Sequence, residues 1–309
     1  MSPTNLDPQS QTFLSDVNRT ESQLSIAEDQ LTSGKRVNVA SDDPDVVSQL
    51  LSLRSALQRN TQIQTNLGIE QAAASVADTA LTNAIQMLDQ AQTLAAQGVT
   101  ATVDASTRAG LASDVEGVLD EMVSLSQTES AGTFVFGGDQ ATQPSYQVDL
   151  ANDNGVDQLV TTQATRQVEN PAGGSFQASM TAQDIFDDRN ADGSLASDNV
   201  FAALNSLRTA LQNNDVDGIN SALTSLSEAS AHLNACQSFY GSVENRLQDA
   251  VNFASTYNVQ IQSQISQYED ADIAAASLEF TQGSVQLEAA FQMEGQIPRT
   301  TLFNYLSST

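Results

Sequence analysis

Oxygen-bearing side chains recur at every second position of one loop, at Asp188, Asn190 and Asp192, and Gly193 follows them. Oxygen ligands at positions one, three and five with glycine at six match the first half of an EF-hand calcium loop. Position twelve, however, is Asn199, where such a loop needs a glutamate that binds with both oxygens. A polar loop that leads into a helix uses the same residue types. We therefore expect no cofactor and an ordinary polar loop, with a Ca²⁺ site at this segment as the alternative.

Two other residues that could do chemistry, His232 and Cys236, are the chain's single histidine and single cysteine. A Ser-His-Asp triad is nearly excluded and a multi-histidine metal site is excluded by this count. His232 precedes the apolar helix position Leu233, which predicts a partly exposed helix residue. Cys236 lies at an apolar position, which predicts a small packed side chain, with a redox or crosslinking thiol as the alternative. We therefore expect a structural protein and not an enzyme.

The net charge of the 309-residue chain is −27, and Lys35 is its only lysine. A chain of this charge repels phosphate backbones and anionic lipid headgroups, so neither nucleic acid nor membrane is an expected partner. No apolar run reaches the roughly 18 residues of a membrane span. The first residues also lack the basic start and apolar core of a secretory signal peptide. If the protein leaves the cell, we expect another export route.

Apolar residues follow heptad spacing near both ends of the chain. Near the N-terminus they alternate steps of four and three between Phe13 and Leu31. In the second half they fall seven apart without a break, at Ile219, Leu226, Leu233, Tyr240, Leu247, Ala254, Ile261 and Tyr268. Such seams hold a helix against neighbouring helices in a coiled coil. The sequence therefore predicts a mainly α fold with long antiparallel coiled-coil helices from both chain ends.

The pattern changes between these helical halves. Segments near residues 146–150, 159 and 176 alternate with period two, and Asn-Gly, Asn-Pro and Gly-Gly pairs separate them. We predict a small β-rich insertion at residues 137–198, too poor in apolar residues for a large core of its own. A helical domain would comprise residues 42–136 and 199–269. A terminal coiled-coil domain would comprise residues 1–41 and 270–309.

Several segments resemble the bacterial flagellin superfamily. Residues 31–44 (LTSGKRVNVASDDP) resemble its N-terminal signature, and residues 241–247, 269–273 and 302–306 resemble its C-terminal helices. These segments lie in both helical ends, which together make up well over half of the chain. The first dozen residues are more polar than is usual in the family, so the first helix is expected to be shorter.

The resemblance implies terminal helices that line the channel of the flagellum, and self-association into a ring or polymer. It also implies export without a cleaved signal peptide, an export chaperone on the C-terminal helix, and an extracellular location. Within the superfamily, residues 132–146 resemble the members at the hook–filament junction, whose partners are another hook-associated protein and flagellin. The alternatives are a filament-forming flagellin and a surface ligand-binding module.

The assembly interface is expected to use apolar residues of both terminal helical segments. These are Phe13, Val17, Leu24, Leu31, Phe280, Leu287, Phe291, Leu302, Phe303 and Leu306.

Overall fold

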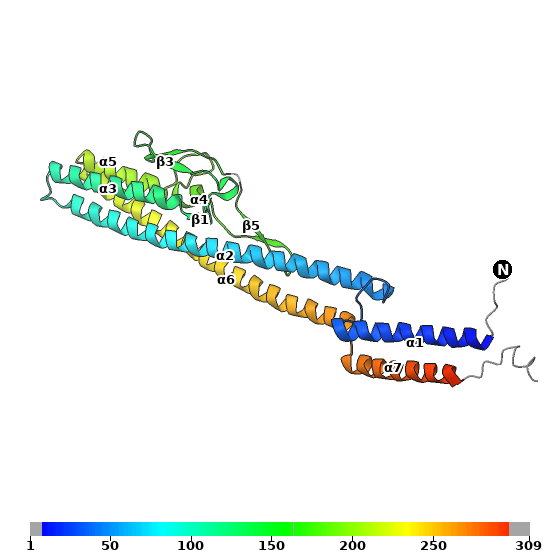
Figure 1. Ribbon diagram of the computed structural model, residues 1–309. Coiled ribbons are helices and arrows are strands. Elements are labelled where there is room, and N and C mark those ends of the chain that lie inside the picture. Colours follow the sequence, from blue (N-terminus) through cyan, green and yellow to red (C-terminus); the bar gives the residue numbers. More distant parts are fainter. Residues whose placement is uncertain (1–7, 163, 297–309) are drawn as a thin grey trace, which may run out of the picture. The chain divides into compact units, whose positions relative to one another are not determined.

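The computed structural model describes residues 8–162 and 164–296, and most of them are helical (Figure 1). The helices are α1 (Pro8–Ser33), α2 (Pro44–Val99), α3 (Ala105–Ser126), α4 (Ala182–Phe186), α5 (Val200–Gln212), α6 (Val216–Glu269) and α7 (Ile273–Gln296), with a 3-10 turn η1 (Gly138–Gln140). The strands are β1 (Glu129–Ser130), β2 (Thr133–Phe134), β3 (Tyr146–Val148), β4 (Val156–Gln158), β5 (Gln167–Glu169) and β6 (Ser175–Gln177). Consecutive strands pair as three antiparallel two-stranded sheets. The predicted mainly α fold with a small β-rich region is confirmed.

The chain divides into two compact units. One contains the two chain ends, up to Gln58 and from Asn258 onward, and the other contains Arg59–Tyr257. Both α2 and α6 contribute residues to each unit. In the described part of the chain, no helix is long and apolar enough to cross a membrane.

Within the Arg59–Tyr257 unit, α2 and α6 pair in an antiparallel arrangement. Side-chain hydrogen bonds connect Asn60 with the Ala254 carbonyl, Gln71 with Gln248, Thr82 with Gln237, and Gln92 with the Leu226 carbonyl. As the residue number rises along α2, the number of the bonded residue on α6 falls, so the two helices run in opposite directions. The predicted heptad positions of α6 are buried from Ile219 to Ile261, whereas Tyr268 remains 37% exposed. The heptad seam therefore ends before the last turn of α6.

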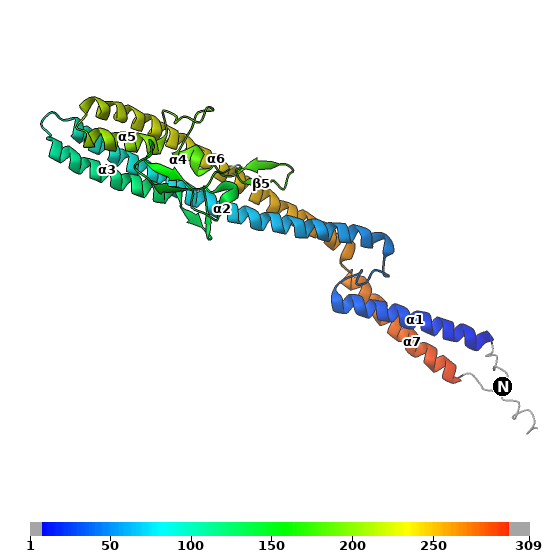
Figure 2. The same cartoon turned by 90° about the horizontal axis from the view of Figure 1, so that it is seen from above.

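The β-rich insertion shares its core with the helices, which explains its low apolar content. It lies against α3, α5 and α6 (Figures 1 and 2). Edge-on ring contacts connect Phe136 with Phe186 and with Tyr240 of α6, and Phe186 stacks on Phe201 of α5. All four rings are buried. The insertion needs no separate core because the helices already provide apolar surface beneath it.

In the unit formed by the chain ends, α1 and α7 lie side by side in both views (Figures 1 and 2). Val17 and Ala27 of α1 and Ala276 of α7 are buried. A Cβ atom at Gly283 would lie 3.1 Å from Leu24 Cδ1, so glycine permits a close approach of the two helices at this point. The described part of α1 begins at Pro8, where a missing N–H costs nothing because the first helical amides have no partner within the helix.

Candidate functional site

The loop between α1 and α2 is hydrogen-bonded to the loop between α6 and α7. The Arg36 N–H donates to the Glu269 carbonyl (2.6 Å), and the Ala271 N–H donates to the Gly34 carbonyl (3.0 Å). The Arg36 guanidinium also donates to the Tyr268 carbonyl (2.9 Å). We call this set of contacts the loop clamp, and it joins the two segments whose sequences resemble the flagellin signatures.

The Glu269 carboxylate is the buried charge of the loop clamp. Its side chain is 5% exposed and forms ion pairs with Lys35 and with Arg54 of α2, the latter at 2.8 Å. Burial alone would raise the pKa of Glu269. The hydrogen bonds from Lys35 and Arg54 outweigh burial and hold the pKa below its ordinary value. The carboxylate is therefore ionised at neutral pH and links both cations to the end of α6.

The acidic signature residues on both sides of the loop clamp organise their own loops. Asp42 Oδ2 accepts the backbone N–H groups of Asn38 and Val39, each at 2.8 Å. Asp43 accepts a hydrogen bond from Arg36 at 2.8 Å, which holds the pKa of Asp43 below its ordinary value. At the other loop, Asp272 Oδ1 accepts two N–H groups of the first turn of α7. Asp272 thus pairs amides that the start of α7 leaves without a partner, whereas Asp42 and Asp43 pair donors of the loop between α1 and α2.

We predict that Glu269→Gln lowers the stability of the loop clamp by about 1–2 kcal/mol at pH 7, a discounted value because both cations are half exposed. Because the pKa of Glu269 is lower in the folded than in the unfolded protein, its ionised carboxylate stabilises the fold at any pH above the unfolded-state pKa of about 4.3. This stabilisation is lost as the pH falls through the folded-state pKa of Glu269. Amide hydrogen exchange over residues 34–43 measures the change at pH 7. Thermal unfolding of both proteins should become equal only at a pH below the depressed pKa of Glu269 in the folded protein.

Asp270→Asn serves as the matched control. Asp270 is exposed and pairs with Lys35 through backbone atoms, so a change of its side chain leaves this contact in place. Equal exchange rates in Glu269→Gln and in the wild type at pH 7 would contradict the role given to Glu269.

The apolar residues predicted for assembly lie mainly between α1 and α7. Val17 is buried, and the others of this set up to Leu287 are partly buried in the contact between the two helices. Phe291 is 54% exposed. The remaining three, Leu302, Phe303 and Leu306, lie outside the described residues. Their role in contacts between subunits stays a prediction.

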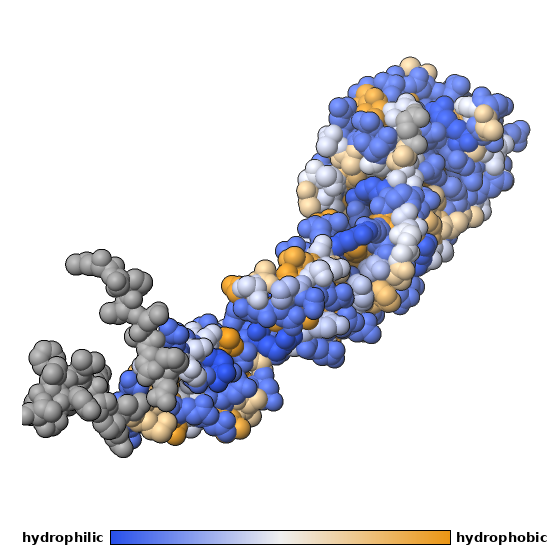
Figure 3. All heavy atoms as spheres, turned by 90° about the vertical axis from the view of Figure 1, so that its right-hand side faces the viewer, coloured by the Kyte–Doolittle hydropathy of each residue, from blue (hydrophilic) through white to orange (hydrophobic). Residues whose placement is uncertain are grey.

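A second group of apolar side chains on these helices is exposed. On α7, Leu278 is 58% exposed and Val285 is 61% exposed. They lie seven residues apart and therefore on one face. The surface view shows separate hydrophobic patches on a mostly hydrophilic molecule (Figure 3). The exposed apolar set of α1 and α7 comprises Leu14, Ile26, Ile273, Leu278, Val285, Phe291 and Met293. Apart from Phe291 this set was not predicted, although the heptad spacing of Leu278 and Val285 was available as a signal.

The predicted calcium loop is a hairpin in which all three predicted ligands make local hydrogen bonds, Asp188 by accepting the Arg189 N–H at 2.9 Å. Asp192 Oδ1 accepts the N–H and the hydroxyl of Ser194, at 3.0 and 2.6 Å. The Asn190 amide donates to the Ser194 hydroxyl and to the Leu195 carbonyl. Asp188 also lies beside Asp198 and His232. Calcium binding by Asp188, Asn190 and Asp192 stays a prediction.

A fully buried carboxylate, Asp187, was not predicted from the sequence. Its oxygens accept hydrogen bonds from Asn154 and Asn199 (both 2.8 Å), from Tyr146 (3.4 Å), and from Nε and Nη2 of Arg189 (3.0 and 2.8 Å). Asn199, the candidate twelfth calcium-loop position, caps α5 through its side-chain oxygen. Asp187 therefore connects the insertion to the start of α5.

Family models match both helical halves of the chain. The N-terminal helical region of bacterial flagellin matches residues 5–141, and the C-terminal helical region matches residues 217–306. Together they include more than half of the chain. The chain belongs to the bacterial flagellin family. This flagellin-family protein is a structural component of the flagellum, and the loop clamp lies where its two matched halves meet.

Relatives of the flagellin-family chain include both a flagellar hook-associated protein and a flagellin. It is 24% identical to flagellar hook-associated protein 3 of Escherichia coli K12, over 79% of this chain and 74% of that protein. It is 25% identical to flagellin of Bacillus subtilis 168, over 92% of this chain and 93% of that protein. The crystal structure of the flagellar junction protein FlgL from Legionella pneumophila has the same fold, with a TM-score of 0.55 and 12% identity over 72% of this chain and 99% of that one.

Proposed function

We propose that this flagellin-family chain is a hook–filament junction subunit, an adaptor that joins the hook-associated region to the flagellin filament. The observation that carries the proposal is the exposed apolar set of α1 and α7. Burial of one such aliphatic side chain contributes up to about 1.5–3 kcal/mol, so covering several of them stabilises a contact between subunits considerably. The isolated chain leaves this surface exposed, and neighbouring subunits would cover it.

The partners follow from this place in the flagellum. Another hook-associated protein would contact the subunit on the hook side, flagellin would contact it on the filament side, and copies of this chain would contact one another in a ring. Its location would be extracellular, after export without a cleaved signal peptide. A flagellar export chaperone would cover the C-terminal helical segment beforehand, because exposed apolar surface promotes unwanted association.

The choice of junction over filament rests on residues 132–146 and on the name of the E. coli relative. In the structure, Val135 and Phe136 of this segment are buried, and the Phe136 carbonyl accepts the Ala182 N–H at the start of α4. The segment thus positions the insertion on the helices. The alternative, a filament flagellin, is favoured by the match to B. subtilis flagellin along nearly the whole chain.

Deletion of the gene tests the proposal. We expect electron micrographs to show intact hooks without filaments, flagellin in the culture medium, and recovery of filaments when the wild-type gene is restored. Purified protein should remain unpolymerised under conditions in which flagellin assembles. Long filaments grown from this chain alone, or a deletion strain that keeps its filaments, would contradict the junction assignment.

A further inference from the structure

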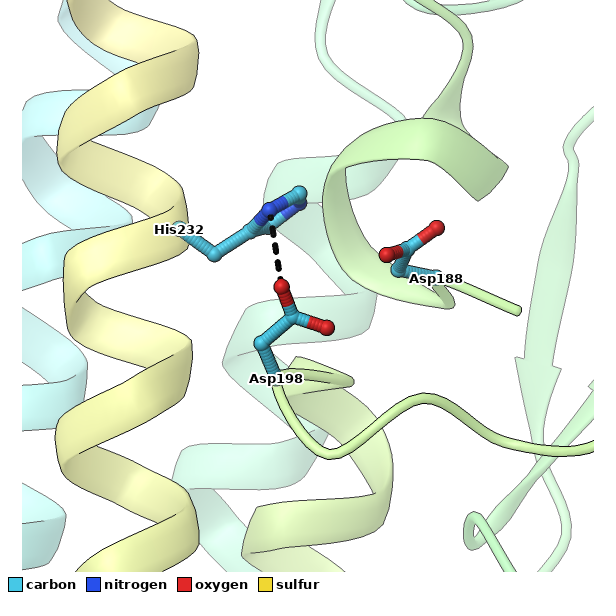
Figure 4. Close-up of side chains that lie close together, drawn as sticks. All are labelled: Asp188, Asp198 and His232. Atoms are coloured by element: carbon cyan, nitrogen blue, oxygen red, sulfur yellow. Dashed lines mark ion pairs between the residues drawn. The ribbon is translucent and has the colours of Figure 1, made fainter. Parts of the chain in front are cut away.

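Three side chains that could bind a metal converge between the insertion and α6. The Asp–His cluster consists of Asp188 in the loop after α4, Asp198 in the loop before α5, and His232 on α6 (Figure 4). Their ligand atoms lie within 4.8 Å of one another. The His232 side chain is only 17% exposed and its Nδ1 lies 3.4 Å from Asp198 Oδ2. The segment between α4 and α5 and the helix α6 therefore bring two carboxylates and one imidazole close together.

The hydrogen bond at Nε2 sets the orientation of the His232 ring. Nε2 lies 2.9 Å from the Asp184 carbonyl, and a carbonyl oxygen can only accept, so Nε2 carries the hydrogen. The other ring nitrogen, Nδ1, faces Asp198 Oδ2, so either a proton or a metal cation can lie between the ring and this carboxylate. An N–H donated to a backbone carbonyl is also how metal-binding histidines are usually held.

Apart from His232, no basic side chain among the described residues forms an ion pair with Asp188 or Asp198. Among the described residues, Asp198 forms an ion pair only with His232, and the nearby Arg189 pairs with Asp187. Asp188 and Asp198 therefore place two carboxylates beside each other in a partly buried position, where a bound cation would reduce their mutual repulsion.

The backbone beside each ligand is held firmly. The Asn199 amide donates to the Asp187 carboxylate and to the Asp188 carbonyl, at 2.8 and 2.9 Å. This pair of hydrogen bonds fixes the two ends of the hairpin that carries Asp188 and Asp198. On α6, Leu233 next to His232 is fully buried. The ligands are thus positioned by buried neighbours, and only their side chains need to move to close on an ion.

We infer that Asp188, Asp198 and His232 bind a divalent first-row transition-metal ion, Zn²⁺ in the first place. Imidazole nitrogen favours zinc and its neighbours, whereas Ca²⁺ and Mg²⁺ prefer oxygen ligands alone. Tetrahedral zinc with bonds of about 2.0–2.1 Å separates its ligand atoms by about 3.4 Å, which small side-chain rotations here can reach. Water completes the coordination. The Cys236 thiol lies 3.6 Å from Nε2 of His232 and not at Nδ1, the nitrogen that faces Asp198, so it is not part of the cluster.

The bound ion would cross-link the insertion to α6. Asp188 and Asp198 belong to the segment between α4 and α5, and His232 is held on the long helix, so the ion joins parts of the chain far apart in sequence. Binding to the folded state alone stabilises it. We therefore expect Zn²⁺ to raise the unfolding temperature.

Calorimetric titration of tag-free, EDTA-treated full-length protein with ZnCl₂ tests the site. We expect one ion per chain in the wild type. His232→Gln and Asp198→Asn should each weaken binding by more than about 100-fold, beyond the usual effect of losing an outer hydrogen-bond partner. Asp192→Asn, in the same hairpin but outside the cluster, should bind like the wild type. Circular dichroism of each variant confirms folding.

Imidazole NMR of the wild type needs no substitution, because His232 is the chain's only histidine. We expect a hydrogen on Nε2 and a Zn²⁺-dependent shift of the Nδ1 resonance. Absence of Zn²⁺ binding in the wild type or an unchanged Nδ1 signal would overturn the inference. So would loss of binding in Asp192→Asn, which would place the ion in the hairpin loop.

Discussion

Replacement of Asp187 with alanine is expected to lower the free energy of unfolding of the Arg59–Tyr257 unit by about 3–5 kcal/mol. The Asp187 carboxylate is fully buried, and it accepts hydrogen bonds from four side chains. Its removal leaves the buried Asn154 amide without its acceptor, leaves the Asn199 amide with only the Asp188 carbonyl, and unpairs Arg189. Each unsatisfied buried group costs about 1–3 kcal/mol. Urea unfolding of the full chain, followed by far-ultraviolet circular dichroism, measures the loss.

Asp192→Ala provides the matched control for this prediction. Asp192 lies on the same hairpin but is exposed, and its hydrogen bonds are confined to Ser194. A substitution at such a surface position changes stability by only about 0.5 kcal/mol. A loss below about 1 kcal/mol for Asp187→Ala would mean that water satisfies the amides of Asn154 and Asn199 as well as the carboxylate does.

The double substitution Leu278→Asp and Val285→Asp is expected to abolish incorporation into the flagellum. Both side chains are largely exposed on one face of α7, so each change alters the stability of the isolated chain by only about 0.5 kcal/mol. In an assembled contact, the same carboxylates would be buried without a partner, at a cost of several kcal/mol each. Motility assays and electron micrographs of a deletion strain that carries the variant gene measure the effect.

Gln282→Asp combined with Gln286→Asp is the control, because it adds the same charge to the same helix and removes no apolar side chain. Both glutamines are exposed. We expect this control to keep at least partial motility. Normal filaments in the Leu278→Asp, Val285→Asp strain would show that this face of α7 remains in solvent after assembly. That result would remove the main support for the proposed contact.

The sequence predicted the helices well because their signal is local and periodic. Residues such as Leu226, Leu233 and Tyr240 repeat every seven positions, and a stripe with this spacing can be buried only by a neighbouring helix. The α2–α6 pair and the buried seam up to Ile261 agree with this reasoning. Leu278 and Val285 of α7 also lie seven residues apart, but they remain exposed in the folded chain.

The polar sites had no such period and were decided by the tertiary structure. Asp187 stands beside the calcium-like motif, yet its partners come from β-region loops and from Asn199 at the start of α5. Glu269 meets Lys35 and Arg54 only because the loops at the two chain ends are hydrogen-bonded to each other. The pairing of a carboxylate with a distant donor depends on the path of the backbone, and sequence spacing does not record that path.

The loop at residues 188–193 shows the same division. The spacing of its oxygen-bearing side chains suggested a Ca²⁺ site at Asp188, whereas His232 was predicted to be an ordinary helix residue. Chain spacing pointed to Asn190 and Asp192 as the other ligands, whereas the fold places Asp198 and His232 beside Asp188. Spacing along a loop describes only neighbours in sequence. The packing of α6 against the insertion decides which side chains meet across it.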